Sequence, residues 1–435
     1  MTTLVVNGGK VLNGRVRVGG NKNAALPVIA ACLLTAEECV LENVPHIRDV
    51  EVMAELLRHL GASVVWEGAS TLRIRAEVIT STEPRADLVA RLRGSVLLLG
   101  PLLARRGEAI LGAPGGDFPS RRNLNQHHAA LRELGARPRD KGGFEAPEGL
   151  KASSFYMLEA SVTATEMALL AAALARGTTE IRHAACEPHV SELGRFLSKM
   201  GAEVEGIGSP TLRITGAMKL RGVTHRIAGD FIEAGSFAVV GAMTRGHVFI
   251  QGASSEDLEP VVAVLRQFGL DGRMNGEELE VRPSQLRAAH RVTTGLWPGF
   301  PSDMVSLVTV LATQASGATL IHDWLYELRL FALDQLSGMG ADLFLCDPHR
   351  ILINGPRRLR GRSLDSRDIR SGMALITAAL AADGESRISP LETVERGYEG
   401  LVERLKSLGA SVETETYLDS IRDAGSTSNL DRVGG

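Results

Sequence analysis

The sequence is poor in aromatic residues, in cysteine and in excess charge of either sign. Phe, Trp and Tyr make up 4% of its 435 residues, and the formal net charge is −3. A charge balance of this kind gives no indication of a general affinity for nucleic acid or for a membrane surface, although it is compatible with a local cationic pocket. The four cysteines form no C-x-x-C pair. Their spacing suits neither a disulfide framework nor a zinc site, which indicates a reducing, cytoplasmic setting.

Long apolar runs are also missing. The stretch "SVLLLGPLLA" falls well short of the roughly 20 residues that a membrane span needs. The start, "MTTLVVNGGKV", lacks the basic stretch and the apolar core of a signal peptide. A chain of 435 residues is too long for one ordinary core, so we expect two domains. We expect residues 418–435 to form a disordered tail.

One pattern recurs six times along the chain. Each copy has an apolar helix, a turn, a short strand and a second, amphipathic helix, followed by two strands. The second helix ends each time in an apolar–Gly–small tag, at Gly61, Gly135, Gly201, Gly269, Gly340 and Gly409. Each glycine is expected to be the left-handed residue that ends a helix. Six units divide into two domains of three, with the first helices buried because they are apolar nearly all round.

Basic residues stand at equivalent places in these repeats, beside the helix starts. They are Lys22, Arg93, Arg122, Arg329, Arg370 and Arg396. A lone arginine at a helix start is usually a solvated surface residue, but so many at equivalent positions argue against independent decoration. Helix N-termini also offer free backbone N–H groups. We therefore expect two bodies whose helix N-termini face a shared cationic cleft, suited to a small and multiply anionic substrate.

The chain resembles the enolpyruvyl transferases, in particular those that act on UDP-N-acetylglucosamine. The resemblance runs from about residue 4 to 415. Its motifs are "KNAALP" at 22–27, "LRGS" around Arg93, "PGGD…R" at 114–122, "IEAGSF" at 232–237, "PSDM" at 301–304, "ELR" at 327–329, "DIR" at 368–370 and "ERGYE" at 395–399. It implies a fold of two inside-out α/β barrel domains, each made of three βαβαββ repeats. The expected domains are 22–229, and 1–21 together with 230–417, with the active site between them.

The resemblance also implies a reaction that uses no metal or organic cofactor. Phosphoenolpyruvate is protonated at its methylene carbon, an acceptor hydroxyl attacks the central carbon, and the tetrahedral adduct loses phosphate. By motif match, Lys22, Arg122 and Arg396 contact phosphoenolpyruvate, and Arg93, Arg329 and Arg370 complete the cationic wall. Asp303 is the expected base for the acceptor hydroxyl, while Asn23 and Glu327 orient these groups.

Asp117 stands where most members of this family carry the cysteine that serves as general acid, although some members have aspartate. It is therefore expected to donate the proton, or to order its loop when substrate arrives. A free aspartate titrates near 3.9, and Arg121 and Arg122 should lower that pKa. To act as an acid, Asp117 must be desolvated or pressed against the substrate phosphate.

Further departures from the family pattern concern the acceptor. The stretch "EASVTATEM" has Ala160 in place of a lysine and Thr163 in place of a glycine, where family members hold the acceptor's diphosphate. Asn125 and Gln126 also differ from the pattern, while His127 is kept. These losses favour a smaller acceptor, UMP at its ribose 3′-hydroxyl, as in nucleoside antibiotic pathways of the nikkomycin and polyoxin type.

Two alternatives stay open. The first is the cell-wall reaction with UDP-N-acetylglucosamine. The second is a non-catalytic relative that binds a nucleotide and regulates, which the intact set of Lys22, Asp303, Arg370 and Arg396 disfavours. Neither nucleic acid nor a membrane is an expected partner, and the oligomeric state is not predicted.

Overall fold

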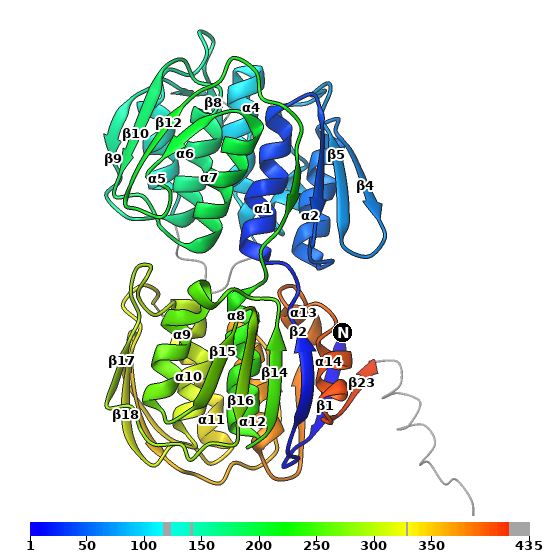
Figure 1. The fold of residues 1–435 in the computed structure, drawn as a ribbon, viewed down its shortest axis with the longest axis vertical. Coiled ribbons are helices and arrows are strands. Elements are labelled where there is room, and N and C mark those ends of the chain that lie inside the picture. Colours follow the sequence, from blue (N-terminus) through cyan, green and yellow to red (C-terminus); the bar gives the residue numbers. More distant parts are fainter. Residues whose placement is uncertain (116–122, 140–141, 328, 417–435) are drawn as a thin grey trace, which may run out of the picture.

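The computed structural model describes residues 1–115, 123–139, 142–327 and 329–416. It is an α/β molecule of two bodies stacked along the long axis (Figure 1). The chain begins in the lower body, crosses into the upper body before Lys22, and returns near Asp230 (Figure 1). We call the upper part the first body and the lower part the second body.

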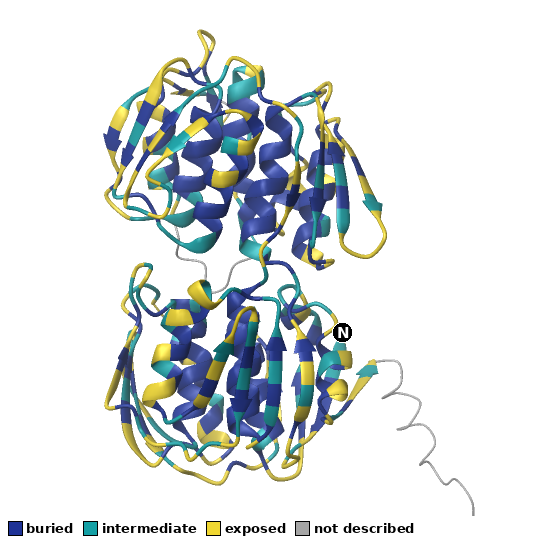
Figure 2. Cartoon of the chain, in the orientation of Figure 1, coloured by how far each residue is buried: buried dark blue, intermediate teal, exposed yellow. Residues whose placement is uncertain are grey.

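Each body contains its own hydrophobic cluster. The first cluster runs from Ala24 to Ile227. The second takes residues from Leu4 to Val18 and again from Phe231 to Val412. Helices fill the interior of both bodies, while residues on the sheets alternate between buried and exposed (Figure 2). In α8 (Phe231–Met243) every residue is buried, which confirms that an apolar first helix lies inside its body.

Three sheets belong to the first body, with strand orders β13-β3-β5-β4, β11-β12-β10-β9 and β6-β8-β7. The strands are β3 (Glu38–Glu42), β4 (Ser63–Glu67), β5 (Thr71–Arg75), β6 (Glu108–Ala109), β7 (Arg137–Pro138), β8 (Phe144–Glu145), β9 (Ser154–Tyr156), β10 (Thr178–Arg182), β11 (Glu203–Glu205), β12 (Thr211–Thr215) and β13 (Thr224–Arg226). The helices are α1 (Lys22–Ala31), η1 (Cys32–Leu34), α2 (Arg48–His59), α3 (Ala86–Val89), η2 (Arg93–Leu98), α4 (Leu99–Arg106), α5 (Asn125–Glu133), α6 (Val162–Ala172) and α7 (Pro188–Met200), where η marks a 3-10 helix.

The second body also has three sheets, with strand orders β15-β16-β14-β2, β17-β18-β20-β19 and β21-β22-β1-β23. The strands are β1 (Thr2–Asn7), β2 (Asn13–Arg17), β14 (His247–Gln251), β15 (Asp271–Asn275), β16 (Glu278–Arg282), β17 (Arg291–Thr293), β18 (Gly317–His322), β19 (Asp342–Asp347), β20 (Arg350–Gly355), β21 (Ser363–Asp365), β22 (Glu385–Ser389) and β23 (Ser411–Thr416). Besides α8, the helices are α9 (Ser255–Gln267), η3 (Ser302–Met304), α10 (Val305–Ala312), η4 (Arg329–Leu333), α11 (Gln335–Gly338), α12 (Ile369–Ala381), α13 (Leu391–Glu395) and α14 (Leu401–Ser407).

The five four-stranded sheets share one pairing pattern. The strand after the first helix pairs with one neighbour in parallel and with the other antiparallel, as β3 does with β13 and β5. In the sixth unit the N-terminal β1 takes the place of the last strand, because it pairs antiparallel with both β22 and β23.

All six glycines that end the second helices have positive φ, between 86° at Gly269 and 116° at Gly201. The prediction of left-handed helix ends is confirmed.

In two of the six units, the second helix is less regular than the repeat predicts. In the fifth unit, the short η4 and α11 replace one long helix. In the sixth, α13 and α14 are separate, and Gly400 between them has a φ of 53°. A left-handed residue interrupts helical hydrogen bonding, so the chain turns there.

The two crossings between the bodies pair with each other. Gly20 and Gly229 form an antiparallel bridge, and Asn21 N donates to Ala228 O at 2.7 Å. A Cβ on Gly20 would lie 1.8 Å from the carbonyl oxygen of Asn43. Any side chain at this position would therefore push the crossing away from the first body.

Candidate functional site

Lys22 is the first residue of α1, at the end of the first body that faces the second (Figure 1). The side chain of Asn21 caps this helix by accepting hydrogen bonds from Asn23 N at 2.8 Å and Ala24 N at 3.2 Å. The Lys22 ammonium lies 2.9 Å from a carboxylate oxygen of Asp49. The cap thus fixes the start of the helix, and the start of the helix positions the cation.

Asp49 joins the two bodies. Its Oδ2 accepts from Lys22 Nζ, and its Oδ1 accepts from Arg396 Nε of the second body at 2.9 Å. The Asp49 side chain is only 4% exposed. Burial alone would raise the pKa of this carboxyl, but the charges of Lys22 and Arg396 outweigh burial and lower it. Asp49 is therefore held ionised between two cations that the sequence assigned to substrate binding.

Asp49 was missed in the sequence, although a signal was present. It is the second residue of α2, close to the repeat position at which other units carry Arg122, Arg329 and Arg396. An acidic residue at that position breaks the pattern of cations. That break could have marked Asp49 as their counter-charge.

Asp303 forms a second cation-paired carboxylate, this time within one body. Its two oxygens lie 3.2 Å from Arg329 Nη1 and 3.2 Å from Arg370 Nη2. Arg370 is the second residue of α12, whose N-cap is the Asp368 side chain. Burial would lower the pKa of Arg370, but Asp303 and then Tyr398 raise it above its ordinary value. The guanidinium therefore stays charged despite its burial.

A buried polar network holds Arg329 in place. Arg329 Nη1 donates to Ser302 Oγ at 2.7 Å, and Ser302 Oγ donates to Asp323 Oδ2 at 2.7 Å. Asp323 is fully buried and also accepts from Thr294 Oγ1 at 2.8 Å. Because each buried polar atom has a partner, the Arg329 side chain is fixed before any substrate arrives.

The residues assigned to the acceptor form a third group in the first body. His127 Nε2 lies 2.9 Å from Thr163 Oγ1. Burial lowers the pKa of His127 to about 3, and the charge of Arg93 contributes. His127 is therefore a neutral imidazole near pH 7. Arg93 Nη2 donates to the carbonyl of Asn123 at 3.1 Å.

Contacts between side chains join the expected residues, where they are described, in three groups. The groups are Lys22 with Arg396, Arg329 with Arg370 and Asp303, and His127 with Thr163 and Arg93. Glu327 is exposed beside η4, and Asn23 lies in the first turn of α1. Asp117 and Arg122 lie outside the described residues, as does the predicted tail.

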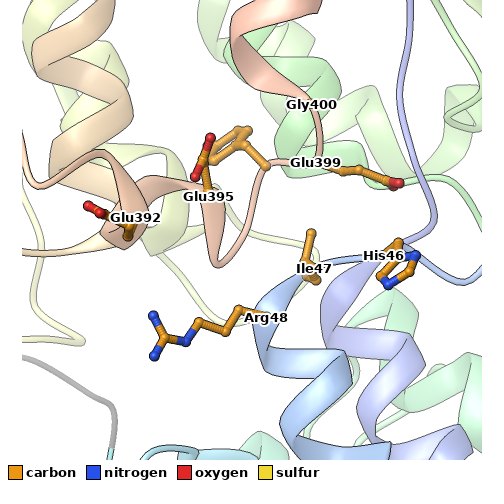
Figure 3. Close-up of a pocket in the computed structure, with 8 residues that line it drawn as sticks. His46, Ile47, Arg48, Glu392, Glu395, Glu399 and Gly400 are labelled. Carbon is orange, nitrogen blue, oxygen red and sulfur yellow. The ribbon is translucent and has the colours of Figure 1, made fainter. Parts of the chain in front are cut away.

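A pocket of about 280 Å³ opens between the bodies, beside the start of α2 (Figure 3). Its lining consists of His46, Ile47, Arg48, Glu392, Glu395, Tyr398, Glu399 and Gly400. Burial raises the pKa of Glu395, and so do the charges of Glu392 and Glu403. Three glutamates make this pocket poorly suited to an anionic ligand.

Among residues 1–115, 123–139, 142–327 and 329–416, no group of three His, Cys, Asp or Glu side chains could hold a metal ion. In the same part of the chain, no helix is both long and apolar enough to cross a membrane.

Comparison with known proteins gives concordant results. The model of a family described as EPSP synthase (3-phosphoshikimate 1-carboxyvinyltransferase) matches residues 6–405. The UDP-N-acetylglucosamine 1-carboxyvinyltransferase of Treponema denticola is 43% identical over 95% of this chain and 99% of its own. That of Bradyrhizobium diazoefficiens is 44% identical over 94% of this chain and 97% of its own.

Solved structures agree with the sequence relatives. The enolpyruvyl transferase NikO from Streptomyces tendae superimposes with a TM-score of 0.87 at 26% identity, over 95% of this chain and 99% of that one. EPSP synthase from Acinetobacter baumannii gives a TM-score of 0.75 at 20% identity, over 96% of this chain and 100% of that one. The second comparison shows a shared fold.

Proposed function

The chain belongs to the enolpyruvyl transferase family, and from that premise we propose that it transfers the enolpyruvyl group of phosphoenolpyruvate to a hydroxyl of a uridine nucleotide, with release of phosphate. The observation that carries this proposal is the convergence of Lys22 and Arg396, from different bodies, on a single carboxylate. Two cations that already hold an anion between the bodies can hold the phosphate or carboxylate of phosphoenolpyruvate in the same way.

The proposed reaction assigns a role to each group. Asp117 donates a proton to the methylene carbon as the C2=C3 electron pair forms the new C–H bond. The acceptor O–H bond breaks, its oxygen bonds to C2, and the proton goes to Asp303. The Asp117 carboxylate then takes back a proton from C3, whose C–H electron pair restores the C2=C3 double bond as the C2–O bond to phosphate breaks. The leaving phosphate carries away the proton that Asp303 had accepted, so both carboxyl groups return to their starting forms. Lys22, Arg122 and Arg396 hold phosphoenolpyruvate, with Arg93, Arg329 and Arg370 offsetting negative charge and Asn23 and Glu327 orienting the reactants. No metal or organic cofactor takes part.

The acceptor is proposed as UMP, with UDP-N-acetylglucosamine as the second candidate. Thr163 Oγ1 lies within hydrogen-bond distance of His127 Nε2 at the start of α6. Ala160 offers no cation there, so position 160 adds no positive charge for a diphosphate beside that of Arg93. Identities of 43% and 44% to UDP-N-acetylglucosamine 1-carboxyvinyltransferases favour the second candidate. The relatives are named as transferases, which disfavours the alternative of a non-catalytic regulator.

We further propose that the two bodies are the domains 22–229 and 1–21 with 230–417, each an inside-out α/β barrel of three repeats. The two separate hydrophobic clusters support this division. A cytoplasmic location, with phosphoenolpyruvate and a uridine nucleotide as the partners, fits the same proposal.

Phosphate release from phosphoenolpyruvate tests the function, with UMP, uridine, UDP and UDP-N-acetylglucosamine offered in parallel. We expect release to be fastest with UMP. Faster release with UDP-N-acetylglucosamine would select the second candidate, and no release with any acceptor would refute the proposal. Lys22→Ala should abolish most of the signal. Lys219→Ala, which changes a lysine that is 76% exposed on the same body, should not.

A further inference from the structure

Tyr398 is a fully buried tyrosine to which the proposed reaction gives no role. It lies in the segment between α13 and α14 of the second body. This segment packs closely on the start of α12, because a Cβ on Gly397 would lie 2.7 Å from Cγ2 of Ile369. Ile369 is the first residue of α12 and Arg370 is the second. Tyr398 is therefore held beside the guanidinium group of Arg370.

Hydrogen bonds run in one direction from Arg370 through the hydroxyl of Tyr398. Arg370 Nη1 donates to Tyr398 Oη at 3.4 Å, since a guanidinium group has no acceptor atom. Ser236 Oγ donates its single hydrogen to the carbonyl of Ile232 at 2.7 Å. In the 2.8 Å contact between Ser236 Oγ and Tyr398 Oη, Tyr398 is therefore the donor. Burial raises the pKa of Tyr398, so the hydroxyl keeps the proton that it donates.

These contacts set the orientation of the guanidinium group. Ser236 belongs to α8, which is buried along its whole length, and it fixes the place of the Tyr398 hydroxyl. While Arg370 Nη1 contacts that hydroxyl, Arg370 Nη2 donates to Asp303 Oδ2 at 3.2 Å. Arg370 Cζ also lies 5.8 Å from the centre of the Tyr398 ring, within the range of a cation–π attraction. Two nitrogens of one planar group thus have different partners, which limits its rotation.

We propose that Tyr398 is a positioning residue for Arg370, and that its hydroxyl keeps the guanidinium group turned toward Asp303. This inference rests on the proposed function, in which Asp303 takes the acceptor proton. A guanidinium group beside Asp303 favours the ionised form, which is the form that accepts a proton. Arg329 holds the other oxygen of Asp303, so loss of the Tyr398 hydroxyl should weaken the site without dismantling it.

Tyr398→Phe in the full-length protein tests the inference, because it removes the hydroxyl and keeps the ring. With the uridine nucleotide that gives the fastest phosphate release, we expect kcat at pH 7 to fall roughly three- to tenfold and both KM values to stay nearly unchanged. The acidic limb of the profile of kcat/KM against pH should move up by roughly 0.3–0.5 unit, because a loosened Arg370 favours ionised Asp303 less. Tyr156→Phe, which changes a tyrosine that is 59% exposed on the first body, should leave both readouts unchanged.

A second background separates positioning from packing. Arg370→Lys replaces the planar fork by a single ammonium group, which cannot be oriented between two partners in the same way. In that background, Tyr398→Phe should lower kcat by no more than about twofold, because the group that it positions is gone. Equal losses in the two backgrounds would assign the effect to packing and would overturn the proposal. An unmoved limb in Tyr398→Phe alone would overturn it as well.

Ser236→Ala provides another reading if Tyr398→Phe does not fold. It leaves the Tyr398 hydroxyl in place but removes the atom that fixes it, so the acidic limb should move in the same direction by a smaller amount. A limb that moves down in Ser236→Ala would contradict the proposal. Absence of phosphate release by the unmodified protein would instead overturn the proposed function, so the two failures are distinguishable.

Discussion

Asp49 and Asp303 are both carboxylates held by two cations, but the cations come from different places. The partners of Asp49 are Lys22 of the first body and Arg396 of the second. Both partners of Asp303, Arg329 and Arg370, belong to the second body. The Asp49 side chain is 4% exposed and that of Asp303 is 28% exposed.

This difference separates two tasks. The geometry around Asp303 is complete within one body, so it is preorganised whatever the distance between the bodies. The geometry around Asp49 exists only when the bodies stand as they do here. In the proposed function an incoming anion competes with Asp49 for Lys22 and Arg396, and this competition would change the contact between the bodies. Substitutions can separate the proposed base, which lies within one body, from the contact between the two bodies.

The largest effect is expected for Asp303→Asn. An amide cannot accept the acceptor proton, so turnover should fall roughly 10²- to 10⁴-fold. Binding of phosphoenolpyruvate should change far less, and steady-state phosphate release with both substrates varied separates the two quantities. Asp271→Asn, an exposed change in the same body, is the control. Near-normal turnover in Asp303→Asn would mean that another group is the base.

Lys22→Ala and Arg396→Ala should follow in size. Each removes a cation from the pair that converges between the bodies, and the loss of transition-state stabilisation should be about 2–4 kcal/mol in kcat/KM. The two variants should resemble each other, although the residues belong to different bodies. A large loss in one and none in the other would show that the two cations do not act on one anion.

The repeat made much of the fold predictable. Six glycine-tagged helix ends and the burial of the first helices follow from local chemistry, and the structure confirms both. The place of β1 in the sixth sheet does not follow from that chemistry. Residues 2–7 and 411–416 lie at opposite ends of the chain, and their pairing depends on how the second body closes.

The site was predictable as a set of cations but not as a set of pairs. Motif matches selected Lys22, Arg370 and Arg396, and repeat positions placed them at the ends of helices. Asp49 was not predicted, because it is acidic where other repeats carry cations, and because its second partner is 347 residues away in the sequence.

Asp49→Asn should destabilise the folded protein in a manner that depends on pH. The pKa of Asp49 is lowered in the fold, so its ionic stabilisation is fully present above the ordinary aspartate range and is lost as the pH falls through the lowered value. At pH 7, the free energy of unfolding should fall by about 2–3 kcal/mol, because two partly buried cations lose their counter-charge.

Denaturant unfolding at a series of pH values checks this prediction. The difference between the two proteins should shrink below about pH 4, where Asp49 of the unfolded chain begins to be protonated while Asp49 of the folded protein is still ionised. Asp87→Asn, which breaks the exposed pair with Arg85, should leave the unfolding midpoint within experimental error. A difference that stays constant down to pH 2 would mean that the effect comes from packing and not from charge.

Ser302→Ala should have the smallest effect and should separate the two carboxylates most sharply. Its hydroxyl accepts from Arg329 and donates to Asp323, so the variant loosens one partner of Asp303 and leaves Asp49 untouched. The loss of one hydrogen bond to a charged group should lower kcat roughly three- to tenfold. The pH dependence of unfolding that Asp49 confers should stay as it is.

Ser306→Ala is a matched control, because the Ser306 hydroxyl is also buried but has no hydrogen-bond partner. An equal loss of kcat in both serine variants would assign the effect to the packing of α10. A loss in Ser302→Ala alone would assign it to the orientation of Arg329 against Asp303.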